Sequence, residues 1–201
     1  MSADADSLSQ VRVAEDRDRA AVAATLARAF GEDPATGFIF PDAARRANQL
    51  PKLFALLFNE DVRGMRLVTT GGEAATLWRP PGGNRTSRLD LLREAIPLLR
   101  IFGTALGRAL AVSDAIDVHL PRGDYWYLHI AGCEPAAQGK GFGGVAVRSG
   151  LERIAESGLP AYLETPLERN IGFYQGLGFE VTADWVVPKG GPRFWSMWRK
   201  A

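Results

Sequence analysis

The stretch QGKGFGG, residues 138–144, has to decide between two folds. Its glycines at 139, 141 and 144 spell GxGxxG, the fingerprint of dinucleotide-binding domains, and Glu164 stands where that motif places an acid for the ribose. Gln138, Gly141 and Gly143 also spell QxxGxG, a loop that holds the pyrophosphate of coenzyme A. Either loop sets backbone N–H groups against a phosphate at the start of a helix. The rest of the chain has to distinguish them.

The surroundings of the loop disfavour a dinucleotide-binding domain. In that fold the first glycine follows its strand at once. Here residues 134–138 separate Gly139 from YWYLHIAGC (125–133), the most strand-like run of the chain. Only 57 residues, 145–201, follow the loop, too few for the remaining strands of a doubly wound sheet. A Walker loop also fails, because Gly141 stands where that loop needs Ser or Thr.

The hydrophobic pattern along the chain predicts one α/β domain with a mixed sheet, spanning residues 1–201. We expect residues 1–9 to be flexible and FGEDPATGFIFPD (30–42) to be a loop that wraps a ligand. The expected strands are 11–14, 66–70, 74–80, 125–133, 161–165, 179–187 and 192–200, and the expected helices are 16–30, 42–62, 86–112, 142–157 and 168–177.

Charge and composition exclude several classes of protein. Lys plus Arg number 24 against 23 Asp plus Glu, so no electrostatic footprint for nucleic acid or an anionic membrane is present. One cysteine and two histidines predict neither a disulfide nor a structural metal site. The apolar segment 95–112 is interrupted by Arg100 and Arg108, so we expect a buried or substrate-covering helix. The first ten residues lack a signal-peptide pattern, and we expect a cytoplasmic protein.

A second motif lies at the distance that the coenzyme A interpretation needs. ERNIGFYQGLGFEV (168–181) places Asn170 and Tyr174 four residues apart, on one face of a short helix. Together with CEPAAQGKGFGG (133–144), this motif resembles the GNAT superfamily of acyl-CoA N-acyltransferases. AFGEDPAT, YLETP and VTADWVVPKGGPRFWSMWRK are in addition similar to the puromycin N-acetyltransferase group within it.

The resemblance implies the GNAT fold, a twisted, mixed, mostly antiparallel sheet flanked by helices, whose splayed central strands hold acyl-CoA. Residues 125–180 would form the acetyl-CoA-binding core, and the helical region 85–120 would lie on the substrate side. The strand ending at Cys133 would hydrogen-bond pantetheine, and the glycine loop would cradle the pyrophosphate. The implied cofactor-binding residues are Ala131, Gly132, Cys133, Gln138, Gly139, Lys140, Gly141, Phe142, Gly143, Gly144, Asn170 and Tyr174.

The resemblance also implies catalytic roles. Tyr174 matches the tyrosine that protonates the leaving thiolate, since a phenol stays protonated at neutral pH. His129 is one candidate base, and its alternation with Ala131 and Cys133 predicts that the three side chains share a face. Glu164 is the second candidate base. A core histidine and an ion-paired glutamate are the structural alternatives, and Cys133 is expected to be an inert thiol rather than a nucleophile.

These expectations combine into one function. The chain would be an acetyl-CoA-dependent N-acetyltransferase that acetylates a primary amine of a small molecule by direct attack. It would act without a metal, nucleic acid or membrane partner, and a homodimer is compatible with its apolar 95–112 segment. Two alternatives stay open at this point: N-terminal or lysine acetylation of a protein, and a non-catalytic acyl-CoA-binding domain.

Overall fold

The computed structural model describes residues 11–83 and 96–201. The segment 1–9, predicted to be flexible, and the first part of the predicted helical region 85–120 lie outside the described residues. In the described part, strands and helices occur in the order that the sequence predicts, with one helix added between residues 30 and 42.

One seven-stranded sheet with the strand order β1-β2-β3-β4-β5-β7-β6 organises the chain. Every neighbouring pair is antiparallel except β4 and β5, which are parallel. The predicted mixed, mostly antiparallel sheet is therefore confirmed. The strands are β1 (Val11–Val13), β2 (Met65–Thr69), β3 (Ala74–Arg79), β4 (Trp126–Cys133), β5 (Ala161–Thr165), β6 (Glu180–Val186) and β7 (Arg193–Arg199).

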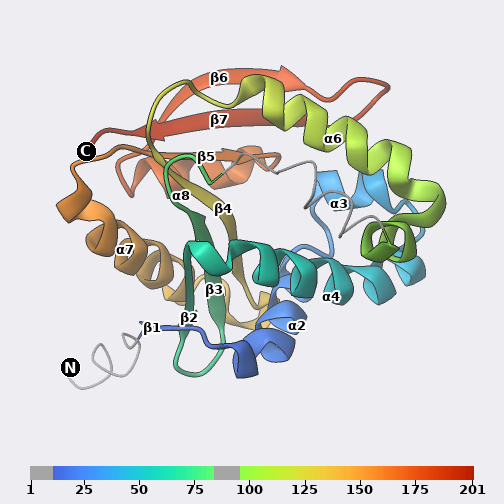
Figure 1. Ribbon diagram of the computed structural model, residues 1–201, viewed down its shortest axis with the longest axis horizontal. Coiled ribbons are helices and arrows are strands. Elements are labelled where there is room, and N and C mark those ends of the chain that lie inside the picture. The colour runs from blue at the N-terminus through green and yellow to red at the C-terminus, as the bar shows by residue number, and fades with distance from the viewer. Residues whose placement is uncertain (1–10, 84–95) are drawn as a thin grey trace.

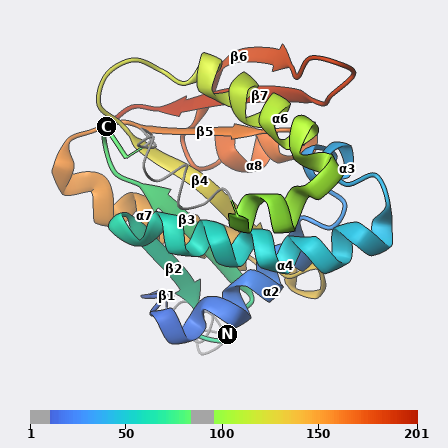
Figure 2. The same cartoon turned by 45° about the vertical axis from the view of Figure 1, so that its right-hand side comes forward.

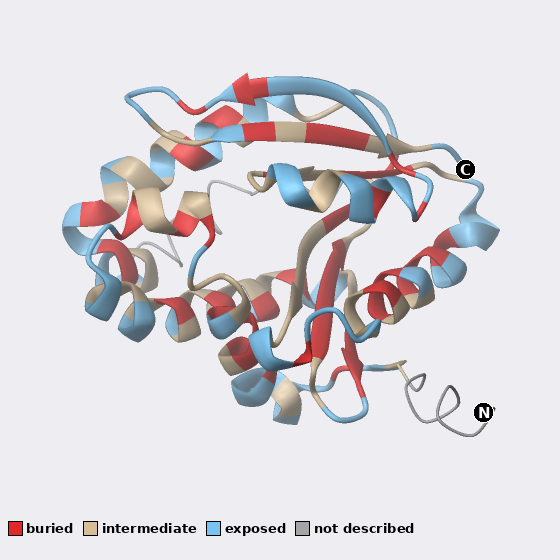
Figure 3. Cartoon of the chain, turned by 180° about the vertical axis from the view of Figure 1, so that it is seen from behind, coloured by how far each residue is buried: buried red, intermediate tan, exposed pale blue. Residues whose placement is uncertain are grey.

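Helices cover both faces of this sheet. Figure 1 shows α4 crossing in front of β2 and β3, and Figure 3, from behind, shows α7 on the other face. The α-helices are α2 (Arg19–Ala29), α3 (Pro34–Ile39), α4 (Ala43–Glu60), α6 (Leu106–His119), α7 (Phe142–Ile154) and α8 (Ile171–Gln175). Short 3-10 turns are η1 (Asp16–Asp18), η2 (Asp61–Arg63), η3 (Gly103–Ala105), η4 (Pro135–Ala137), η5 (Ala155–Ser157) and η6 (Glu168–Asn170).

Two large apolar clusters form most of the core, one on each face of the sheet, and a smaller third cluster contains Tyr125, Tyr127 and Tyr162. The first joins α2, α3, α4 and α6 to one face and includes Leu26, Phe54 and Val112. The second packs α7 and α8 on the other face and includes Val147 and Tyr174. Because a strand turns alternate residues to opposite faces, neighbouring residues of β3 divide between the clusters.

Local sequence signals explain where α4 begins. The carboxylate of Asp42 accepts a hydrogen bond from the backbone N–H of Arg45 at 2.6 Å, which caps the helix at the start of the predicted range 42–62. Leu50, Phe54 and Phe58 form an apolar stripe that is buried in the core. Val62, the last residue of the predicted range, lies beyond the helix in η2 and is 56% exposed.

The segment 30–42 differs from the predicted loop, because residues 34–39 form the helix α3. Asp33 caps this helix by accepting hydrogen bonds from the N–H groups of Ala35 and Thr36 at 2.8 and 3.1 Å. Pro34 occupies the first turn, where a missing N–H costs nothing. The Asp-Pro pair is therefore a helix start, and the sequence interpretation took it for a breaker.

The apolar segment 96–119 is a bent helical region. It has the length and mean hydropathy (1.3) of a membrane-crossing helix, and 22% of its most apolar window is buried in the structure. Gly103 adopts φ +47° at η3, which bends the segment before α6. Figures 1 and 2 both show α6 running between the β6–β7 hairpin and α3. This region therefore covers one side of the sheet, as expected for a substrate-covering helix.

Two irregularities open the middle of the sheet. Strands β4 and β5 pair only at Trp126–Ala161 and Tyr127–Tyr162, and they diverge beyond those pairs. On its other edge β4 carries a bulge, because Leu77 pairs with Ile130 whereas its neighbour Trp78 pairs with Leu128. His129 is the extra residue of the bulge. The predicted splay of the central strands is thus present, and its bulged strand carries a candidate catalytic residue.

Candidate active site

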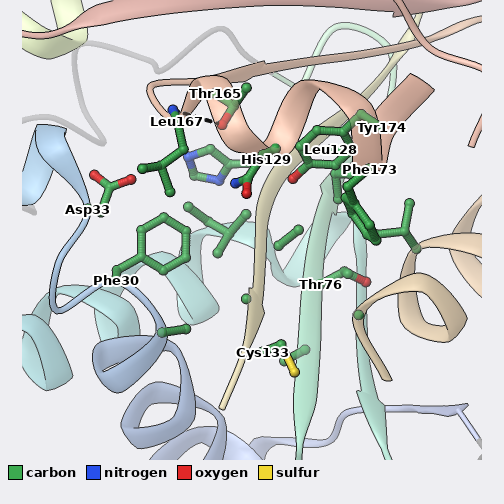
Figure 4. A pocket seen from close by; sticks show the side chains of 18 of the residues that line it. Phe30, Asp33, Thr76, Leu128, His129, Cys133, Thr165, Leu167, Phe173 and Tyr174 are labelled. Carbon is green, nitrogen blue, oxygen red and sulfur yellow. Dashed lines mark hydrogen bonds between the residues drawn. The ribbon is translucent and has the colours of Figure 1, made fainter. Parts of the chain in front are cut away.

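A cavity of about 660 Å³ lies in the opening between β4 and β5. It is lined from both faces of the sheet, by α2, α3, α4 and α6 on one side and by the glycine loop, α7 and α8 on the other. Figure 4 shows His129 and Tyr174 projecting toward the same space, with Cys133 farther along it. Because the cavity extends through the sheet to both core clusters, one ligand can enter it from each face of the sheet.

The glycine loop forms one end of this cavity. Gly139 and Gly141 have φ values of +76° and +90°, which side chains with a Cβ adopt only with strain. Helix α7 begins at Phe142, so the N–H groups of its first turn have no partner within the helix. The amino-terminal end of α7 therefore carries partial positive charge and N–H groups without a partner in the helix at the cavity wall. Both features favour binding of an anionic diphosphate.

All but one of the predicted loop residues line the cavity. Gln138, Gly139, Gly141, Phe142, Gly143 and Gly144 border it. Lys140 does not: its ammonium donates a hydrogen bond to the carbonyl oxygen of Ala136 at 2.9 Å. Its side chain is therefore bound to the turn in front of the loop, and a contact of Lys140 with the cofactor through its backbone N–H stays a prediction.

The residues predicted to contact pantetheine, Ala131, Gly132 and Cys133, line the cavity along β4. Ala131 packs in the cluster on the α7 face. Burial raises the pKa of the half-buried Cys133 thiol above its ordinary value. This shift agrees with an inert thiol, because a nucleophilic cysteine needs a lowered pKa.

His129 does not share a face with Ala131 and Cys133, contrary to the alternation in the sequence. Leu128 and Ala131 both pack in the cluster on the α7 face although they are three residues apart. Ile130 packs in the opposite cluster. The bulge therefore reverses the alternation, and His129 lies on the α4 side, where it meets Asp61.

Tyr174 and Asn170 lie on the α8 side of the cavity. Tyr174 is 7% exposed, and burial raises the pKa of its phenol above the ordinary value, with Glu164 and Asp33 adding to the effect. The phenol is consequently protonated across the neutral range. Asn170 stands directly before α8, and its side chain makes no capping hydrogen bond with that helix.

Glu164 projects from β5 on the α4 side of the sheet. The hydroxyl of Tyr127 donates a hydrogen bond to its Oε1 atom, whereas Oε2 is buried with no hydrogen-bond partner among the described residues. Burial raises the pKa of Glu164 to about 7. The ion-paired alternative is not realised, since no salt bridge to Glu164 is formed within residues 11–83 and 96–201.

His129 is fixed by a buried ionic network. Its Nδ1 atom lies 2.7 Å from Oδ2 of Asp61, and Oδ1 of Asp61 accepts a hydrogen bond from Nε of Arg79 at 2.6 Å. Although burial opposes its ionisation, His129 and Arg79 lower the pKa of Asp61. Burial lowers the pKa of His129, so the imidazole is neutral at pH 7. A proton on Nδ1 then leaves Nε2 as an acceptor.

Two carboxylates of the site were not predicted from the sequence. Asp33 lines the cavity, is 5% exposed, and has its pKa raised to about 6 by burial. The Asp-Pro helix start would have placed it at the beginning of α3. Asp61 follows α4 with no motif around it, so only the tertiary fold identifies it as the partner of His129.

Comparison with known proteins agrees with this geometry. No family model matches the chain. An uncharacterised N-acetyltransferase of Schizosaccharomyces pombe is 27% identical over 179 residues, which cover 82% of this chain and 72% of the relative. The structure of a Corynebacterium glutamicum protein described as histone acetyltransferase HPA2 and related acetyltransferase is 26% identical, with a TM-score of 0.70 and 96% of each chain covered. The protein is an acetyltransferase with the fold of GNAT acetyltransferases.

A third similarity concerns the GNAT fold alone. The Drosophila melanogaster polyamine N-acetyltransferase, which forms N-acetylagmatine, superposes with a TM-score of 0.60 at 16% identity, covering 96% of this chain and 99% of that one. The features of the GNAT fold on which cofactor binding depends, the splayed strands and the glycine loop before α7, are both present here. The cavity residues thus fit acetyl-CoA, the acyl donor of GNAT acetyltransferases.

Proposed function

We propose that this GNAT protein transfers an acetyl group from acetyl-CoA to a primary amine of a small molecule. The observation that carries the proposal is the cavity through the sheet. It brings the protonated phenol of Tyr174 from one face together with the unpartnered carboxylate oxygen of Glu164 from the other. A proton donor and a proton acceptor flanking one space are what transfer from a thioester to an amine requires.

Acetyl-CoA supplies an acetyl thioester. Its transfer to an ammonium group removes two protons from the amine nitrogen and gives one to the thiolate sulfur, so one proton passes to solvent. We infer that backbone N–H groups of the loop 138–144 bind the diphosphate, and that β4 binds pantetheine at Ala131, Gly132 and Cys133. Asn170 borders the same channel. These contacts would hold the donor so that the acetyl group reaches the opening between the strands.

Tyr174 is the proposed general acid. Its pKa lies above that of a thiol, so it keeps its proton until a thiolate forms beside it. A phenol in a buried site donates without competition from bulk water. Its position on α8, directly across the cavity from β4, supports the role that the NIGFYQGLGF motif implies.

Glu164 is the proposed base, and His129 supports it. A group whose pKa is near the operating pH accepts a proton most effectively, and burial raises the pKa of Glu164 to about 7. As a carboxylate it also attracts the ammonium form of the amine. His129, neutral and held by Asp61, offers Nε2 as a hydrogen-bond acceptor in the same cavity. Its lowered pKa makes it the weaker base.

The neighbouring structures include enzymes for small amines, namely an Aedes aegypti arylalkylamine N-acetyltransferase and the Drosophila polyamine enzyme. They also include an Escherichia coli enzyme for the alanine of ribosomal protein S18. Residues of α6 close over the cavity at Val112 and Ile116, which favours a small acceptor over a peptide. The similarity of both chain ends to the puromycin N-acetyltransferase group adds puromycin to the acceptors worth testing.

The test is thiol release from acetyl-CoA by the purified protein with a panel of amines. The panel contains arylalkylamines, alkylamines, agmatine, polyamines, puromycin and short peptides. Release with a small amine that is lost in Tyr174→Phe supports the proposal. Release only with peptides would show protein acetylation instead. Acetyl-CoA binding by calorimetry without release from any amine would favour a non-catalytic acyl-CoA-binding domain.

A further inference from the structure

The half of the cavity on the α4 side has an apolar wall. Side chains from the end of α2, from α3, α4 and α6, and from β7 contribute to it. Its aliphatic and aromatic side chains include the following six: Phe30, Ile39, Leu57, Val112, Ile116 and Phe194. All six belong to or pack against one core cluster, so they form a continuous surface rather than scattered contacts. A ligand that enters this half loses water from most of its surface.

Polar groups meet this wall at its inner end. Phe194 lies two residues from Ser196 on β7, and Ser196 pairs with Glu164 on β5. Because alternate residues of a strand share a face, Phe194 and Glu164 lie on the same face of the sheet. Tyr127 and His129 line the cavity beside Glu164. The wall therefore leads from apolar side chains directly to the carboxylate.

Asp33 is the second carboxylate in this half of the cavity, and it already has hydrogen-bond partners. Oδ1 of Asp33 accepts the N–H groups of Ala35 and Thr36, and Arg169 lies within electrostatic reach of the same carboxyl. Its charge is thus partly balanced by the helix start and by a cation. Glu164 also lies within electrostatic reach of a cation, Arg79, but its Oε2 atom has no hydrogen-bond partner among the described residues. That unpartnered oxygen makes Glu164 the stronger site for a single ammonium group.

We propose that the acceptor is a monoamine carried on an apolar body, of the arylalkylamine or branched alkylamine class. Its ammonium group meets Glu164, and its ring or alkyl group packs between Leu57 of α4 and Val112 and Ile116 of α6. This inference rests on the proposed function and adds the class of acceptor. A polyamine would carry its further ammonium groups into the apolar wall, where a charge without a partner is unfavourable. A peptide would carry backbone amides there, with the same disadvantage.

The first experiment compares kcat/KM for phenethylamine, isoamylamine, ethylamine, agmatine, spermidine and an alanyl peptide, with acetyl-CoA saturating. We expect phenethylamine and isoamylamine to exceed agmatine, spermidine and the peptide by about tenfold or more. A preference for agmatine, spermidine or the peptide would overturn the inference while leaving acetyl transfer intact. Release of thiol with none of the six would overturn the proposed function as well, so the two failures are distinguishable.

The second experiment changes the wall itself. Ile116→Trp fills the space, and we expect it to reduce kcat/KM for phenethylamine by about tenfold or more while ethylamine still reacts. Turnover of ethylamine and an unchanged KM for acetyl-CoA show that the variant is folded. Leu110→Trp is the matched control, because Leu110 lies on the same helix but is 51% exposed and does not line the cavity. Equal losses for phenethylamine and ethylamine in Ile116→Trp, or equal effects of the two variants, would refute the subsite.

Discussion

Replacing Glu164 by Gln tests the proposed base most directly. The amide retains an oxygen that accepts the Tyr127 hydroxyl, so the fold around β5 should persist. It cannot accept a proton or attract an ammonium group. General base catalysis by a positioned side chain typically contributes a factor of about 10² to 10⁴. We therefore expect kcat for the preferred amine to fall by at least about a hundredfold, with the KM for acetyl-CoA unchanged.

The pH dependence gives a second, independent signature. Glu164 acts in its ionised form, and its pKa is raised to about 7. In the wild-type protein kcat/KM should therefore be constant above pH 8 and fall as pH decreases through 7, about tenfold per unit at lower pH. Glu164→Gln should lose this step. His129, whose pKa is lowered, would produce a step below pH 6.5 instead.

The assay is thiol release measured from pH 5.5 to 9 with saturating acetyl-CoA. Glu168→Gln is the matched control, since Glu168 is an exposed carboxylate on η6, close in sequence and outside the cavity. It should retain both the rate and the step at pH 7. A Glu164→Gln variant that retains the step would show that another group titrates there. That result would refute the assignment of Glu164 as the base.

Three further changes test other parts of the argument. Tyr174→Phe should lower kcat by about a hundredfold without changing acetyl-CoA binding by calorimetry, since only the proton donor is lost; unchanged turnover would contradict the general acid. Asp61→Asn should lower the free energy of unfolding, measured with urea, by about 3 kcal/mol, because it removes the buried carboxylate that pairs with Arg79. A decrease below about 0.5 kcal/mol would contradict the ionic network. Gly150→Ala should cost about 2 kcal/mol or more, because the new Cβ would lie 2.5 Å from the buried indole of Trp78. Gly107→Ala is the control, because Gly107 is an exposed helical residue with open space around its Cβ position. This variant should stabilise the protein by about 0.5–1 kcal/mol. Similar changes in the free energy of unfolding for the two glycine variants would contradict the close contact at Gly150.

The parts of the site that were predictable from the sequence are those that depend on backbone conformation over a few residues. The loop 138–144 needs glycine at two positions with positive φ and a helix immediately after it, and both requirements leave a readable pattern. Tyr174 was identified through the resemblance of NIGFYQGLGF to the GNAT motif, and the short helix keeps its spacing to Asn170. In each case the determining interactions are local.

The parts that were not predictable depend on contacts between distant segments. A bulge adds one residue to β4 without any glycine or proline to mark it, and strict alternation therefore placed His129 on the wrong face. Asp61 and His129 are in contact although they are 68 residues apart in the sequence, so no local sequence pattern links the two. Asp33 is different, because its cap of α3 is local and the Asp-Pro signal was present but was interpreted as a break.

The opening in the sheet is the feature that makes the proposed chemistry possible. In a continuous sheet, Tyr174 in one core cluster and Glu164 on the opposite face would be separated by a layer of paired backbone. Because β4 leaves β5 after Tyr127, that layer is missing where the two side chains approach. The bulge at the following positions then turns His129 toward the side of Glu164. An acid for the sulfur and a base for the amine nitrogen could thus serve the same carbonyl carbon from opposite faces of the sheet, with each reactant held by its own half of the cavity.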